Sequence, residues 1–153
     1  MILSNDIESI TDKLIRDYYP ELKGIVIRVK LKKGKGFFMQ TYLVPYFMYI
    51  FLGYRIEIHK SALKMSKESF IGCLGHELEH IAYQHTMRSG FFDASDQDER
   101  VIDQRLIDRG LGKNLFAFLK HHNSKYKKYK KKDGLTEKEV EKQLQVFNEA
   151  AKY

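Results

Sequence analysis

The stretch SKESFIGCLGHELEHIAYQHTM, residues 66–87, decides the fold class of this chain. Ser66 can cap a helix, and Glu68 would lie in its first turn, where the helix dipole favours an acid. Gly90 follows soon after the stretch, so we expect the helix to end near Met87. Apolar residues recur along it at helical spacing, which predicts that one side of the helix is buried. They are Phe70, Ile71, Leu74, Leu78 and Ile81.

The pattern changes type on either side of this helix. Upstream, residues 5–18 have helical periodicity, and the residues that follow have β character. The expected strands are 24–31, 37–44 and 55–59, the first two joined as a hairpin by a glycine-containing turn. Downstream, helices are expected over 95–109, 115–129 and 136–152. This order predicts an α+β fold in two layers, a small three-stranded sheet with helices packed on it.

The central helix contains His76-Glu77-Leu78-Glu79-His80, an HExxH motif. Two histidines four residues apart differ by about 40° around a helix axis, so both imidazoles can bind one metal ion. Zinc suits imidazole ligands, and Glu77 occupies the position of the base that activates a zinc-bound water in such motifs. Glu79 does not share that geometry, and we expect it to be solvated.

A catalytic zinc site needs a third protein ligand, which we expect downstream of the motif. Glu99, near the start of the next helix, is the preferred candidate, and Asp96 and Asp98 are the alternatives. Asp103 lies four residues after Glu99 and therefore on the same helical face. Zinc-bound histidines usually donate their second N–H to a carboxylate, and Asp103 can accept it.

The motif His76-Glu77-x-x-His80, followed by Glu99-x-x-x-Asp103, resembles the gluzincin metallopeptidases. With Arg55–His59 before it, the region to Gly110 is similar to the minigluzincins and to the CAAX-protease-like catalytic core. The resemblance implies a zinc-dependent peptidase with a zincin-like catalytic domain over residues 1–112. It also implies that Arg55–His59 is the edge strand of the sheet, which pairs with an extended peptide substrate.

Four further residues have chemistry that a metal site could use. Cys73 lies one turn before His76; a small buried core residue is the favoured interpretation, and an extra thiolate ligand or a redox latch is the alternative. His59 fits a strand residue at a turn, although it could touch substrate or metal. His121 and His122 could donate to a reaction intermediate, but they fit surface positions better.

The composition is that of an ordinary folded protein, because 43% of the residues are apolar and 31% are charged. The stretch Phe37–Tyr54 is rich in apolar side chains, but Gln40, Thr41 and Pro45 interrupt it. We therefore expect strands there rather than a membrane span. The single cysteine and an N-terminus without a signal-peptide pattern lead us to expect a cytoplasmic location.

The net charge of +7 is concentrated near the C-terminus. Residues Lys113–Lys132 contain eight lysines and no acid, which could give weak contact with nucleic acid or another anionic surface. Residues 113–153 are expected to pack on the same domain, and we expect the last helix to occlude part of the cleft beside Phe37–Tyr54. A latent enzyme and a non-catalytic zinc-containing binding module, recruited to nucleic acid by the lysines, are the alternatives to an active peptidase.

Overall fold

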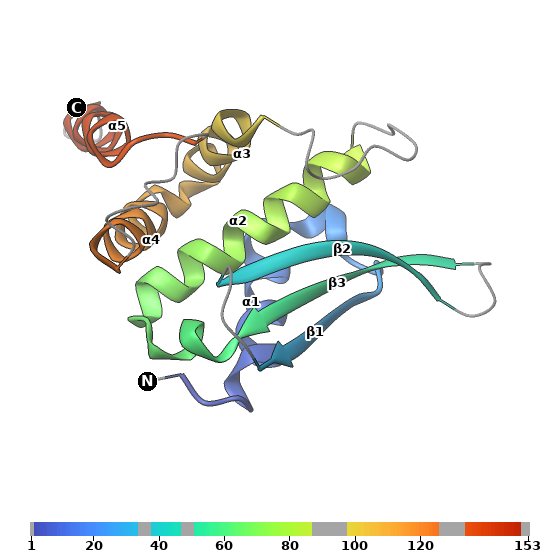
Figure 1. Cartoon of the computed structure of the whole chain (residues 1–153). Coiled ribbons are helices and arrows are strands. Elements are labelled where there is room, and N and C mark those ends of the chain that lie inside the picture. Colours follow the sequence, from blue (N-terminus) through green and yellow to red (C-terminus); the bar gives the residue numbers. More distant parts are fainter. Residues whose placement is uncertain (1, 34–37, 47–50, 87–97, 126–133, 151–153) are drawn as a thin grey trace.

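The computed structural model describes residues 2–33, 38–46, 51–86, 98–125 and 134–150. The elements follow the order α, three β strands, then α only, so the predicted α+β class is confirmed (Figure 1). The helices are α1 Asp6–Tyr18, α2 Lys67–Thr86, α3 Glu99–Leu106, α4 Gly112–Lys125 and α5 Glu137–Ala150. The strands are β1 Ile27–Lys32, β2 Met39–Tyr46 and β3 Phe51–His59.

The sheet has the order β1-β3-β2, with β1 parallel and β2 antiparallel to β3. Ile56 of β3 lies opposite Val29 of β1 and Thr41 of β2. The expected hairpin between the first two strands is therefore wrong, and Arg55–His59 belongs to the central strand rather than to an edge. The physical reason is burial: Ile56 and Ile58 are fully buried, so β3 gains most from a neighbour on each side, whereas β1 is largely exposed.

The two faces of the sheet differ in polarity. Tyr54, Ile56 and Ile58 alternate along β3 towards one face and belong to the hydrophobic core with side chains of α1 and α2. Glu57 points to the other face, where its carboxylate accepts from Lys32 Nζ at 2.6 Å. Apolar and polar residues alternate in this way along an antiparallel strand that has one solvated face. This alternation is why the sequence predicted a strand at β3.

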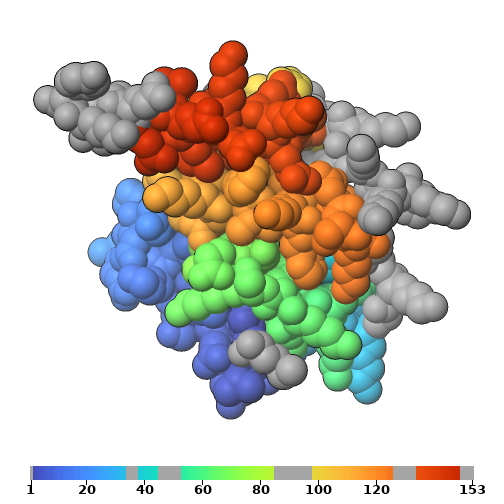
Figure 2. Space-filling model, turned by 90° about the vertical axis from the view of Figure 1, so that its left-hand side faces the viewer, coloured from blue at the N-terminus to red at the C-terminus, as the bar shows by residue number. Residues whose placement is uncertain are grey.

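The helices stack outward from the sheet, with α2 on the sheet, α4 on α2 and α5 outermost (Figures 1 and 2). Gly72 permits the close approach of α2 and α4, because a Cβ there would lie 2.1 Å from the carbonyl oxygen of Asn114. Gly110, with φ +88°, makes the turn from α3 into α4. Within the described residues, no helix has the length and hydrophobicity needed to cross a bilayer.

The last helix is anchored by apolar and polar contacts with α3 and α4. Val140 is fully buried and Leu135, just before the helix, is 6% exposed. Arg100 and Gln104 of α3 hydrogen-bond to side chains of α5. The expectation that this helix docks beside Phe37–Tyr54 is not met, because α2 lies between α5 and the sheet (Figure 1).

Glu79 is fully buried, so the expectation that it is solvated is wrong. Its carboxylate accepts a hydrogen bond from Arg105 Nε at 2.6 Å and another from Arg109 Nε. Arg109 also donates to the Tyr18 carbonyl at 2.6 Å and to Glu21. A buried carboxylate is stable only when it is paired and hydrogen-bonded, and these arginines meet that requirement while joining α1, α2 and the α3–α4 turn.

We predict that Glu79→Ala lowers the free energy of unfolding by about 3 kcal/mol, because it removes the buried carboxylate to which two partly buried arginines donate. Urea denaturation followed by circular dichroism measures this loss. Asp17→Ala is the matched control, since Asp17 forms an exposed pair with Lys13 within one helix. Equal losses in the two variants would contradict the structural role given to Glu79.

Candidate metal centre

His76 and His80 lie on the same face of α2 and are 6% and 7% exposed. Their Nε2 atoms are 3.1 Å apart. The helix is held just before them by Tyr19, whose hydroxyl donates to the Gly75 carbonyl at 2.8 Å. Burial raises the pKa of Tyr19 well above its ordinary value, so the hydroxyl stays protonated and can donate. The local geometry expected from the HExxH spacing is therefore present.

Glu99 completes a group of three possible metal ligands. It is the first residue of α3, and its carboxylate oxygens lie 3.1 Å from His76 Nε2 and 3.3 Å from His80 Nε2. One atom from each of the three residues can be chosen so that all lie within 4.8 Å of one another. Two imidazoles and a carboxylate are the donor set of a transition-metal site, so the group could hold a metal ion.

Asp98 and Asp96 are the alternatives to Glu99 as the third ligand. Asp98 is the N-cap of α3, and its side chain accepts a hydrogen bond from the Arg100 backbone N–H at 2.8 Å. This bond stabilises the start of the helix on which Glu99 is presented. Asp96 lies outside the residues that the structure describes.

Asp103 connects the metal group to the protein interior. It is fully buried, and its Oδ1 lies 2.9 Å from His76 Nδ1. Its Oδ2 accepts the backbone N–H of Leu135 at 2.9 Å. Because a carboxylate only accepts, it favours the tautomer in which Nδ1 carries the proton and the lone pair of Nε2 faces Glu99 and His80. The arrangement matches the role that the spacing predicted for Asp103.

Glu77 contacts the sheet through its side chain. Its side chain is half-buried, and its Oε2 accepts a hydrogen bond from the Thr41 hydroxyl at 2.8 Å. Thr41 lies on β2, which packs beside α2. Sequence reasoning missed Thr41 as a site residue, because this contact joins residues 36 positions apart and depends on the strand order.

The other candidate residues lie apart from this group. Cys73 is 3% exposed and belongs to the hydrophobic core, as its favoured interpretation required. His59 ends β3 and lies two residues after the outward-facing Glu57, on the same face of the strand. His121 and His122 lie near the end of α4, with ring centroids 5.6 and 6.1 Å from that of Phe38. Burial, with the charge of the nearby Lys125, lowers the pKa of His121.

Five of the eight lysines in Lys113–Lys132 lie outside the residues that the structure describes. Lys113, Lys120 and Lys125 lie on α4, and residues 126–133 fall outside the described part of the chain. Comparison of the whole chain with protein-family models, with curated proteins and with solved structures finds no match.

We predict that Glu99→Gln abolishes stoichiometric binding of Zn²⁺ or Co²⁺, whereas Asp98→Asn retains it. Both changes replace a carboxylate by an amide of the same shape, and asparagine remains a good helix cap. Elemental analysis after dialysis and titration with a chromophoric chelator measure the bound metal. Loss of metal from Asp98→Asn together with retention by Glu99→Gln would reverse the ligand assignment.

Proposed function

We propose that this chain is a zinc-dependent peptidase of the gluzincin type, in which His76, His80 and Glu99 hold the zinc and Glu77 is the base. The observation that carries the proposal is the meeting of these ligands from two helices, with Glu77 next to the first histidine. Two neutral imidazoles and one carboxylate leave a zinc ion with positive charge and an open position, which is the donor set of hydrolytic zinc sites.

Zinc bound there would polarise a scissile carbonyl and lower the pKa of a water molecule. The Glu77 carboxylate would take the proton of that water and pass it to the leaving amine. Asp103 keeps His76 in the tautomer that presents Nε2, and its burial prevents water from competing for this bond. Thr41 donates to Oε2 of Glu77 and so limits the orientations that this carboxylate can adopt.

The substrate would lie along β2. This strand is at the edge of the described sheet, and its Thr41 is the residue that contacts Glu77. An extended peptide can add to a sheet edge through backbone hydrogen bonds, which positions an amide bond without selecting a sequence. The family resemblance gave Arg55–His59 the role of the edge strand that pairs with a peptide; we assign this role to β2 instead.

We predict that Glu77→Gln retains zinc and the fold but lowers peptide hydrolysis by at least about 10²-fold, because it removes the general base and not a ligand. A library of quenched fluorescent peptides measures hydrolysis, and elemental analysis measures zinc in the same samples. Activity near wild type in this variant would disprove the mechanism.

We predict that Thr41→Val lowers kcat about tenfold, the rate equivalent of one hydrogen bond of about 1.4 kcal/mol. Thr41→Ser keeps the hydroxyl and is the matched control, which should retain most of the rate. Steady-state kinetics on one cleaved peptide separates kcat from KM. Equal rates in the valine and serine variants would show that the hydroxyl does not position Glu77.

A further inference from the structure

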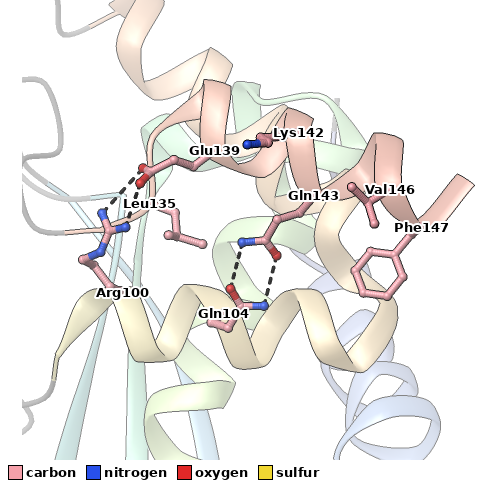
Figure 3. Close-up of a pocket in the computed structure, with 8 residues that line it drawn as sticks. All are labelled: Arg100, Gln104, Leu135, Glu139, Lys142, Gln143, Val146 and Phe147. Atoms are coloured by element: carbon pink, nitrogen blue, oxygen red, sulfur yellow. Dashed lines mark hydrogen bonds and ion pairs between the residues drawn. The ribbon is translucent and has the colours of Figure 1, made fainter. Parts of the chain in front are cut away.

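Helix α3 presents two functional faces. Glu99 and Asp103, four residues apart, lie towards the histidines of α2. Arg100 and Gln104, each one position later, lie towards α5 (Figure 3). The helix that supplies the carboxylates of the metal centre is therefore held from its other side by the C-terminal helix.

The polar contacts between α3 and α5 are paired and directional. Arg100 Nη2 donates to Glu139 Oε1 at 2.7 Å (Figure 3). The side-chain amides of Gln104 and Gln143 donate to each other, at 3.0 and 2.8 Å. Hydrogen bonds from Arg100, and from the backbone and side chain of Thr136, lower the pKa of Glu139 to about 2. Glu139 is therefore ionised over the whole range in which the protein is expected to fold.

A third contact reaches the metal group through Asp103. The Leu135 backbone N–H donates to Oδ2 of Asp103, whose Oδ1 bonds to His76. Asp103 is fully buried and Leu135 is 6% exposed, so water cannot readily take the place of this donor. A displacement of the chain at Leu135 would leave the buried carboxylate short of one hydrogen bond.

Helix α3 needs such support because it has only eight residues. Helices this short are not stable on their own and depend on tertiary contacts. Arg105, near its C-terminal end, is held by Glu79 of α2. Arg100, next to Glu99 at the N-terminal end, is held by Glu139 of α5. The Arg100–Glu139 pair thus lies one residue away from the carboxylate that would bind the metal.

We propose that residues 134–150 are a positioning part of the metal centre, so that docking of α5 on α3 and binding of zinc reinforce each other. The inference rests on the zinc site of the proposed function, and it adds that the C-terminal segment helps to hold the zinc ligands in position. Coupling between two binding events is reciprocal: if α5 strengthens zinc binding, zinc must strengthen the docking of α5 by the same factor. The two directions can be measured separately.

The first test is the zinc affinity of the full-length double variant Glu139→Ala/Gln143→Ala, measured by chelator competition. The variant keeps the buried Leu135 and Val140 and every metal ligand. Its affinity should fall about tenfold, the lower end of the effect of residues that orient metal ligands. The control Glu141→Ala/Gln145→Ala removes the same residue types from exposed positions of α5 and should bind as wild type.

The second test needs no variant: hydrogen exchange of the wild-type chain with and without zinc. Zinc should slow amide exchange in residues 137–148, far from the ligands in sequence. Equal zinc affinity in the double variant and its control, or exchange in α5 that zinc leaves unchanged, would overturn this inference alone. A wild-type chain that binds no zinc would overturn the proposed function as well.

Discussion

A buried carboxylate has to be fully hydrogen-bonded, and Asp103 meets this constraint with one bond to His76 and one to the backbone of Leu135. The bond to His76 sets the tautomer of a metal-ligand candidate. The bond to Leu135 fixes where the chain enters α5. Because both partners must be in place at once, the single side chain at position 103 joins α2, α3 and the C-terminal segment into one unit.

The two acids of the HExxH motif, Glu77 and Glu79, differ in burial and in their partners. Glu77 and Glu79 are two residues apart, so they point to different sides of α2. Glu77 is half-buried beside β2, with Thr41 as its hydrogen-bond donor. Glu79 is fully buried against Arg105 and Arg109. The first environment leaves a carboxylate partly open to solvent beside the sheet, and the second holds helices together through buried ion pairs.

The strand order decides which strand of the sheet lies beside Glu77. With β3 in the centre, its polar side chains face away from α2, and β2 becomes the strand beside the helix. Within the apolar stretch Phe37–Tyr54, residues 39–46 and 51–54 form strands, and Phe38, Met39 and Tyr54 belong to the core. The contact of the lysine-rich segment with an anionic surface stays a prediction.

The sequence by itself determined the α+β class, the helical placement of His76 and His80, and the shared helical face of Glu99 and Asp103. These features are local: residues three or four apart on a helix share a face whatever the rest of the chain does. The tertiary structure alone decided the strand order, the burial of Glu79, the contact of Thr41 with Glu77 and the bond from Leu135 to Asp103. The last three join residues 26 to 36 positions apart. Such contacts, like the strand order, are set by how layers pack together, which periodicity along the chain does not encode.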